Sequence, residues 1–281
     1  MKVIVAEHAG VCYGVERALR LAEEAAATSG NVHTLGPLIH NPQAVEGLRD
    51  HGVDVATTLD EIESGIVIIR SHGVDPAIID AARNKGLDVV DATCPFVGAA
   101  HTCAAELTEA DYSVVIVGEA DHPEVEGIQA HAGGNAIIVQ RADELPARLP
   151  SRRVGIVVQT TQSAARLEEV VTALLPRVTE LRVCNTICSA TTKRQRAADE
   201  LARTVDVMIV VGGHNSGNTT RLAEICREGN ERVYHVETAD EVRSEWFKGC
   251  EKVGVTAGAS TPDVQIRGVI AAIEAMDAHD A

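Results

Sequence analysis

The stretch Ser113-Val114-Val115-Ile116-Val117 is a short run rich in β-branched residues, and the polar loop Asp121-His122-Pro123-Glu124 follows it. A segment of helical period comes next, and another short apolar run begins at Ala136. Short Val/Ile runs alternate in this way with longer Ala/Glu/Arg/Leu segments along the whole chain, which is typical of parallel βα units. The sequence therefore predicts an α/β fold.

The predicted strands form three series of similar order and spacing. The first series comprises residues 3–5, 31–35, 66–70 and 87–91, the second 113–117, 136–140, 154–159 and 181–184, and the third 207–211, 232–236 and 252–256. This self-similarity predicts three small α/β lobes, which we assign to residues 1–94, 95–188 and 189–281. A single large doubly wound sheet is the alternative that the pattern leaves open.

The charge of the chain excludes several classes of partner. Asp and Glu outnumber Lys and Arg 41 to 25 in the 281 residues, so the formal net charge is -16. We therefore expect no nucleic-acid partner and no binding to an anionic membrane surface. No apolar run reaches the ~20 residues of a membrane-spanning helix, and the amino terminus lacks the pattern of a signal peptide. We expect a cytoplasmic protein.

Three of the seven cysteines differ from the others in position. Cys12, Cys94 and Cys188 come from distant parts of the chain, and each occupies a turn at the end of a predicted strand. Three thiolates can hold an iron-sulfur cluster of four irons with one iron left open, whereas a structural zinc ion normally takes four ligands. The cluster is therefore favoured over zinc. The remaining cysteines are expected to be ordinary core thiols: Cys103, Cys184, Cys226 and Cys250.

Several polar side chains in the loops after predicted strands are suited to acid-base chemistry. His40, His72 and His122 lie beside Gly, Asn or Pro, where an imidazole can bind a phosphate oxygen or carry a proton near neutral pH. Glu124 is two residues beyond His122, and a desolvated carboxyl at that position could deliver a proton. Thr160 could orient the reacting group by hydrogen bonding. The other histidines are expected to be surface or structural residues.

The later loops favour a diphosphate ligand. Ser216, Asn218 and Ser260 lead into predicted helices, where their hydroxyls, an amide and free helical N–H groups can bind phosphate without a cluster of lysines. Helix N-capping is the structural alternative for these residues. The chain contains neither G-x-x-x-x-G-K-[ST] nor G-x-G-x-x-G, which excludes the common triphosphate and dinucleotide motifs.

Nine ordered motifs run along the chain: Cys12-Tyr13-Gly14-Val15-Glu16-Arg17-Ala18, Gly36-Pro37-Leu38-Ile39-His40-Asn41-Pro42, Ser71-His72-Gly73-Val74, Asp91-Ala92-Thr93-Cys94-Pro95, His122-Pro123-Glu124-Val125, Gln159-Thr160-Thr161, Asn185-Thr186-Ile187-Cys188-Ser189-Ala190-Thr191, Asn215-Ser216-Gly217-Asn218-Thr219 and Thr256-Ala257-Gly258-Ala259-Ser260. Through these motifs the chain closely resembles the 4-hydroxy-3-methylbut-2-enyl diphosphate reductase family, also called the LytB family, over essentially its full length.

The resemblance implies a [4Fe-4S] cluster held by Cys12, Cys94 and Cys188, with one open iron that takes the substrate's allylic hydroxyl. It also implies a three-lobed, trefoil-like molecule with pseudo-threefold symmetry around the cluster. Glu124 would be the proton donor, and Thr160 would orient the hydroxyl. Thr161 and Thr191 are further candidate members of the site. The diphosphate would be bound by His40, His72, His122, Ser216, Asn218 and Ser260.

The resemblance implies an oxidoreductase that makes isopentenyl and dimethylallyl diphosphate, in the last step of the methylerythritol phosphate route to isoprenoids. One position departs from the family, which usually has Ser-Ser-Asn where this chain has Ser216-Gly217-Asn218. Gly217 loses a side-chain contact but keeps a backbone N–H for the anion. Two alternatives stay open: a divergent paralogue that binds a cluster or diphosphate without this turnover, and a Cys-ligated zinc hydrolase with Glu124 as its base.

The electrons must come from outside, because the chain has no nicotinamide or flavin dinucleotide motif. The resemblance implies a ferredoxin or flavodoxin as donor. Such donors are commonly acidic and would be repelled by most of this acidic chain. We therefore predict a local basic docking patch, with candidates that follow the cluster cysteines in sequence: Arg17, Arg20, Lys193, Arg194 and Arg196.

Overall fold

The computed structural model describes residues 1–279, and its strands form three four-stranded sheets in which every pairing is parallel. The chain divides into two compact units. Unit 1 comprises Met1–Val15, His40–Ala44 and Ser189–Ala281, and unit 2 comprises Glu16–Ile39 and Val45–Cys188. Unit 1 contains one sheet and unit 2 contains two.

The sheet of unit 1 has the strand order β1-β12-β10-β11. Its strands are β1 (Lys2–Val5), β10 (Val207–Val211), β11 (Val233–Val236) and β12 (Lys252–Ala257). The helices of this part of the chain are α7 (Ser189–Ala202), α8 (Gly217–Gly229) and α9 (Asp263–His279). Two short 3-10 turns, Ala239–Glu241 and Ser244–Phe247, precede β12.

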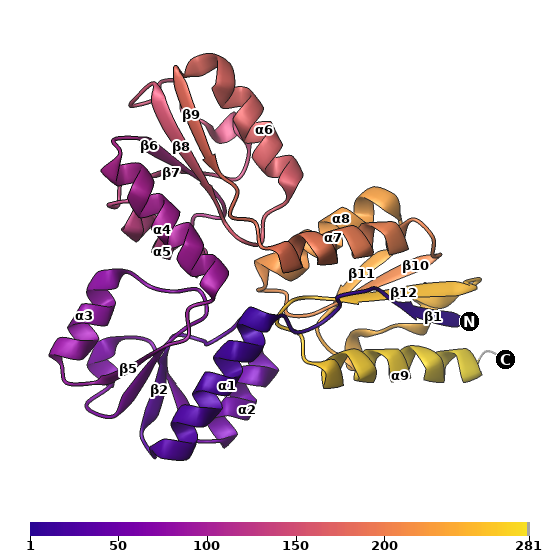
Figure 1. Cartoon of the computed structure of the whole chain (residues 1–281). Helices are drawn as coiled ribbons and strands as arrows, with labels where there is room; N and C mark the ends of the chain where they lie inside the picture. The colour runs from indigo at the N-terminus through magenta and orange to yellow at the C-terminus, as the bar shows by residue number, and fades with distance from the viewer. Residues whose placement is uncertain (280–281) are drawn as a thin grey trace. The chain divides into compact units, whose positions relative to one another are not determined.

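Both faces of this sheet are covered, which explains why its central strand β10 is apolar and buried throughout. Val207 and Ile209 of β10 pack in one core cluster with Ile266 of α9. The alternate residue Met208 packs in the opposite cluster with Leu222 of α8. Figure 1 shows α9 on one side of the sheet and α7 and α8 on the other. A strand buried on both faces reads as a continuous hydrophobic run rather than an alternating one.

The first sheet of unit 2 has the order β3-β2-β4-β5. Its strands are β2 (Val32–Leu35), β3 (Val53–Ala56), β4 (Ile66–Ile69) and β5 (Asp88–Asp91). The helices of the same stretch of chain are α1 (Tyr13–Thr28), α2 (Pro42–Asp50) and α3 (Pro76–Asn84), and a 3-10 turn spans Leu59–Glu61. Asp75 caps α3 by accepting a hydrogen bond from the Ala77 N–H.

The second sheet of unit 2 has the order β7-β6-β8-β9. Its strands are β6 (Ser113–Val117), β7 (Ile137–Val139), β8 (Arg153–Val158) and β9 (Glu180–Cys184). Figure 1 shows α4 (Pro95–Glu109) and α5 (Pro123–His131) on one side of it and α6 (Ala164–Leu174) on the other. The 3-10 turns of this stretch are Ala142–Glu144 and Leu175–Arg177.

The predicted α/β fold with three similar lobes is confirmed, since each lobe contains a parallel four-stranded sheet. Two strand predictions are wrong. The strand at residues 3–5, expected with the first series, instead pairs with β12 from Lys2↔Lys252 to Val5↔Val255. The first series instead gains β3, which the sequence analysis did not predict and which pairs with β2. The run Val53-Asp54-Val55-Ala56 is too short to give a clear alternation.

No helix among residues 1–279 combines the length and the apolar character that crossing a membrane would require.

Candidate active site

Two of the predicted site residues, His122 and Glu124, lie at the start of helix α5. His122 is the N-cap, and its Nδ1 atom accepts a hydrogen bond from the Glu124 N–H at 3.1 Å. Pro123 is the first helical residue, a position where the missing N–H costs nothing. Because Nδ1 accepts, the neutral ring carries its proton on Nε2. In the neutral form, Nε2 of His122 is therefore the N–H donor of the ring.

The carboxyl of Glu124 is buried and paired with Thr160. The Thr160 N–H donates to Oε1 at 2.6 Å, and the Thr160 hydroxyl donates to Oε2 at 2.9 Å. Glu124 follows β6 and Thr160 follows β8, which are neighbouring parallel strands. Their carboxyl ends meet at one edge of the sheet, so residues 36 positions apart come into contact.

Burial raises the pKa of Glu124 to about 7, because the charged form loses its hydration. The two hydrogen bonds from Thr160 oppose this rise, since they favour the carboxylate, while the nearby Glu119 adds to it. Glu124 is only 2% exposed. A carboxyl with a pKa of about 7 can release a proton to a reacting group near neutral pH.

His72 lies beside His122. It follows β4, and the two rings meet edge to face with 5.5 Å between their centroids. The next residue, Gly73, has φ +70°, and a Cβ there would lie 2.4 Å from Cε1 of His101. Gly73 is therefore required both by its left-handed backbone and by the close approach of His101.

His101 is a structural residue that packs against the loop of His72 and against helix α5. A Cβ at Gly127 of α5 would lie 2.9 Å from its Nε2, so the ring packs against that helix as well as against Gly73. Its ring stacks on His131, with 4.1 Å between centroids. Burial, reinforced by His131, lowers the pKa of His101 to about 4, so the ring is neutral at physiological pH. The prediction that His101 is structural agrees with this packing.

The three predicted metal-binding cysteines share one local arrangement. Cys12, Cys94 and Cys188 each stand directly before the first residue of a helix, namely α1, α4 and α7. The positive end of a helix dipole stabilises negative charge there. Thiolates are the usual protein ligands of iron-sulfur clusters. The donor set and its setting therefore fit an anionic cluster.

Each cysteine is also tied by its backbone to a loop with a predicted substrate residue. The Cys94 N–H donates to the Ser71 carbonyl, next to His72, at 2.9 Å. The Cys188 N–H donates to the carbonyl of Thr160 at 3.0 Å. In unit 1, the Cys12 N–H donates to the Ala259 carbonyl, next to Ser260, at 3.1 Å. The residues expected to hold the metal and those expected to hold substrate thus belong to common loops.

Unit 1 brings together five residues that were predicted to bind the diphosphate. Ser216 is the N-cap of α8, and its Oγ accepts from the Thr219 N–H at 3.4 Å. Gly217 is the first helical residue. The Ser260 hydroxyl donates to the carbonyl of His40 at 3.0 Å, although the two residues are 220 positions apart.

Asn218 gives the clearest indication of a ligand in this group. It is 7% exposed, and its Nδ2 is a buried donor without a hydrogen-bond partner. A buried amide donor costs free energy unless something accepts from it. It lies in the first turn of a 13-residue helix, where N–H groups favour an anion. The site therefore fits a phosphate group.

Two further residues support these loops in a way that the sequence did not predict. The Thr219 side chain is fully buried, and a Cβ at Gly258 would lie 2.1 Å from its Oγ1. Thr219 therefore holds the loop that leads to Ser260 against the start of α8. Arg194 is 3% exposed and donates from Nη2 to the Gly10 carbonyl at 2.7 Å, two residues before Cys12. Sequence pattern alone carries no signal that an arginine beside Lys193 is buried.

The other cysteines are partly as predicted. Cys226 lies within α8 and is fully buried, and burial raises the pKa of its thiol to about 12, as for an inert core residue. The prediction of free core thiols is wrong for Cys103 and Cys184, which form a disulfide with 6.7 Å between their Cα atoms. They lie 81 positions apart, on α4 and β9, so no local pattern pairs them.

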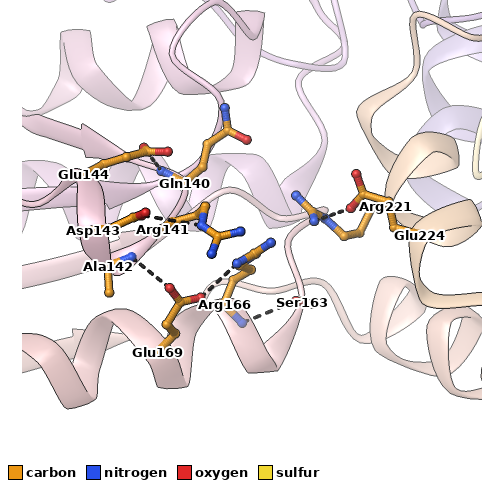
Figure 2. Close-up of polar contacts among 10 residues, drawn as sticks. All are labelled: Gln140, Arg141, Ala142, Asp143, Glu144, Ser163, Arg166, Glu169, Arg221 and Glu224. Atoms are coloured by element: carbon orange, nitrogen blue, oxygen red, sulfur yellow. Dashed lines mark hydrogen bonds and ion pairs between the residues drawn. The ribbon is translucent and has the colours of Figure 1, made fainter. Parts of the chain in front are cut away.

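Most arginines form ion pairs or hydrogen bonds within the chain. Figure 2 shows Arg166 paired with Glu169, at 2.9 Å, and Arg141 paired with Asp143, at 3.4 Å. In unit 1, Arg221 pairs with Glu224 (Figure 2). Of the basic residues predicted to form a docking patch, Arg20 pairs with Glu24 and Arg196 with Glu200.

The predicted docking patch therefore needs correction. Arg194 is buried and cannot contact a partner. Arg17 donates to the carbonyl of Thr93 at 3.1 Å, so its guanidinium holds the loop before Cys94. Lys193 remains as an exposed cation near a candidate cluster ligand.

The fold and the site define a class of protein: an α/β enzyme in which a buried carboxyl with a pKa of about 7 lies in a loop region that also contains two contacting histidines. In addition, three cysteines each precede the first residue of a helix. The family model described as LytB protein matches residues 3–274. The chain therefore belongs to the LytB family.

Curated relatives and solved structures agree with this assignment. A 4-hydroxy-3-methylbut-2-enyl diphosphate reductase of Geobacter metallireducens is 51% identical over 99% of this chain and 98% of its own length. A reductase of the same name from Aquifex aeolicus is 49% identical over 97% and 96%. A solved structure of the reductase that terminates the non-mevalonate pathway covers 97% of this chain and 99% of its own, with 48% identity and a TM-score of 0.72. A solved reductase from Plasmodium falciparum covers 96% and 86%, with 25% identity and a TM-score of 0.91.

Proposed function

We propose that this chain is an oxidoreductase that converts 4-hydroxy-3-methylbut-2-enyl diphosphate into isopentenyl diphosphate and dimethylallyl diphosphate. The observation that carries the proposal is the buried Glu124–Thr160 pair, with its carboxyl pKa of about 7, in a chain of this family. The reaction breaks the C4–O bond, forms a C–H bond and releases water. It consumes two electrons and two protons.

Cys12, Cys94 and Cys188 are the proposed ligands of a [4Fe-4S] cluster with one iron that lacks a protein ligand. Their position before three helices and the chemistry of three thiolates support this assignment. When bound, the cluster supplies single electrons and a Lewis-acidic iron. The backbone bonds from Cys94 to Ser71 and from Cys188 to Thr160 would hold these ligands in register with the substrate residues.

The diphosphate is assigned to His40, His72, His122, Ser216, Gly217, Asn218 and Ser260. The unpaired buried amide of Asn218 supports this assignment, as does the donor tautomer of His122. The N–H groups in the first turn of α8 add the partial positive charge that an anion needs. Gly217 contributes its backbone N–H alone. An enclosed set of neutral donors can bind the anion in spite of the net charge of -16.

Glu124 is the proposed proton donor to the departing hydroxyl. Its buried carboxyl has a pKa of about 7, so about half of the molecules carry the proton at pH 7. A carboxyl of this strength can also release that proton to the substrate. Thr160 fixes both carboxyl oxygens and presents its own hydroxyl beside them, which would orient the substrate oxygen. Loss of the hydroxyl leaves a carbanion-like allyl intermediate. It can be protonated at either end of the allyl group, which gives isopentenyl diphosphate or dimethylallyl diphosphate.

The electrons are proposed to come from a ferredoxin or a flavodoxin, since the sequence carries no dinucleotide motif of its own. Either donor delivers one electron at a time. We propose that the enzyme acts in the cytoplasm and receives its electrons there from such a soluble carrier.

The test is anaerobic purification followed by iron, sulfide and zinc determination and by turnover with dithionite-reduced methyl viologen. We expect about four irons and four sulfides per chain, as in a [4Fe-4S] cluster, and both C5 diphosphates by mass spectrometry. One zinc without sulfide would overturn the proposal in favour of a zinc hydrolase. An intact cluster without either product would favour a paralogue that lacks this activity.

A further inference from the structure

A hollow of about 250 Å³ opens in unit 1 beside Cys12. The loop residues Val11, Cys12 and Tyr13 form one side of it, and Ser189 and Lys193 of α7 form the other. Because Cys12 is a proposed cluster ligand, this hollow brings the protein surface next to a residue that would hold the cluster. The inference below therefore rests on the proposed function.

The rim of the hollow has exposed apolar surface. Tyr13 is 63% exposed, more than any other of the six aromatic side chains, and Val11 is 38% exposed. Tyrosine is enriched at protein interfaces because it offers a large, rigid contact area with a polar tip. Both side chains are therefore accessible to a partner.

The charge of the hollow is opposite to that of the chain. Lys193 is exposed on its wall, Arg194 lies buried behind it, and no carboxylate lines it among the described residues. The formal charge of the chain as a whole is -16. A local cation on an acidic protein marks the place where an acidic partner meets the least repulsion.

A second hollow, in unit 2, provides the comparison. It measures about 580 Å³ and reaches Cys94, another proposed ligand. Its lining includes the carboxylates of Asp91, Glu106 and Glu109, of which Glu106 pairs with Arg182 at 3.5 Å. An acidic partner is repelled there. On the basis of charge, the hollow beside Cys12 is therefore a better docking site for an acidic partner than the hollow beside Cys94.

We propose that the surface formed by Val11, Tyr13 and Lys193 docks an acidic protein that carries one electron at a time. The tyrosine and valine supply apolar contact, and Lys193 supplies charge complementarity. In each encounter the reduced carrier loses one electron and the bound cluster gains it. Two encounters supply the two electrons of one dehydroxylation, and the protons come from Glu124 and from solvent.

The experiment uses the cluster-loaded enzyme and a reduced acidic flavodoxin, with cluster bleaching followed by stopped-flow absorbance. Lys193→Glu is expected to lower the second-order rate constant about tenfold at low salt, and the loss should shrink at high salt because salt screens it. Tyr13→Ser is expected to lower the rate severalfold at both salt concentrations. Lys248→Glu is the matched control, as an exposed lysine elsewhere in unit 1.

Small-molecule reductants separate docking from catalysis. With reduced methyl viologen, turnover and iron content of Lys193→Glu and Tyr13→Ser should equal those of the wild type. Equal rates for Lys193→Glu and wild type with flavodoxin, or equal losses for Lys193→Glu and Lys248→Glu, would overturn the docking surface. Wild-type enzyme that fails to turn over with methyl viologen would instead overturn the proposed function.

Discussion

Thr160 holds both oxygens of the Glu124 carboxylate, with its N–H 2.6 Å from Oε1 and its hydroxyl 2.9 Å from Oε2. The pair is buried, and burial outweighs these two bonds in setting the pKa of Glu124 at about 7. Thr160 thus positions the carboxyl of Glu124, while burial in the surrounding protein sets its pKa.

Glu124→Gln should retain the cluster and substrate binding but lower kcat by a factor on the order of 100 to 10,000, the usual contribution of a general acid. The amide keeps the shape of the carboxyl, and its oxygen can still accept from the Thr160 N–H, but it has no proton to deliver. Steady-state kinetics with methyl viologen checks this. Glu126→Gln, two residues along α5 and exposed, is the control and should keep normal turnover. Near-normal kcat for Glu124→Gln would remove its proton-donor role.

The pH dependence of turnover should report the same carboxyl. Because the protonated form is the donor, kcat should fall tenfold per unit of pH above about 7, the pKa of Glu124. The Thr160 hydroxyl bond favours the carboxylate, so Thr160→Val should raise that pKa and move the midpoint to higher pH. Thr160→Ser keeps the hydroxyl and should leave the midpoint in place. A midpoint that moves to lower pH in Thr160→Val would contradict the assignment.

Stability should depend on pH through Glu124 in a defined direction. The pKa of Glu124 is about 7 in the folded chain and 4.5 ordinarily, so the folded state binds the proton more tightly than the unfolded state. The resulting contribution to the free energy of unfolding is complete below pH 4.5 and is lost as the pH rises through 7. Relative to wild type, the free energy of unfolding of Glu124→Gln should therefore rise by about 3 kcal/mol between pH 4 and pH 8. Urea unfolding of the cluster-free chain at both pH values measures it. A difference that is constant with pH would show that folding does not raise the pKa of Glu124.

Gly217→Ser should bind substrate more tightly. The serine would add a hydroxyl donor at the first residue of α8, next to the unpaired amide of Asn218. One hydrogen bond to a diphosphate corresponds to roughly a three- to tenfold lower KM, with kcat little changed. Steady-state kinetics on the variant decides this. An unchanged KM would indicate that the backbone N–H of Gly217 already satisfies the anion.

Cys12→Ser, Cys94→Ser and Cys188→Ser should each lose most of their iron and sulfide, because a hydroxyl is a poor substitute for a thiolate ligand. Cys250→Ser is the matched control, since Cys250 is a half-buried free cysteine outside the site. Iron, sulfide and visible absorbance on anaerobic protein are the measurements. Full iron content in any of the three site variants would exclude that cysteine as a ligand.

The sequence predicted much of the site because polar residues follow short apolar runs. Parallel strands end at a common edge, so His72, His122, Glu124 and Thr160 could be placed at carboxyl ends without coordinates. The contact of Glu124 with Thr160 rather than with any other loop residue could not be predicted in this way. It depends on β6 and β8 being neighbours, which is a fact of strand order.

The sequence by itself determined the alternation of strands and helices, the repeated lobes and the chemistry of the loops, because these depend on local composition and period. Only the tertiary structure decided that β1 pairs with β12, that Cys103 meets Cys184 and that Arg194 is buried against the Gly10 carbonyl. Each of these contacts joins residues at least 81 positions apart. Local periodicity carries no information about such partners, since they are chosen by the packing of whole sheets and helices.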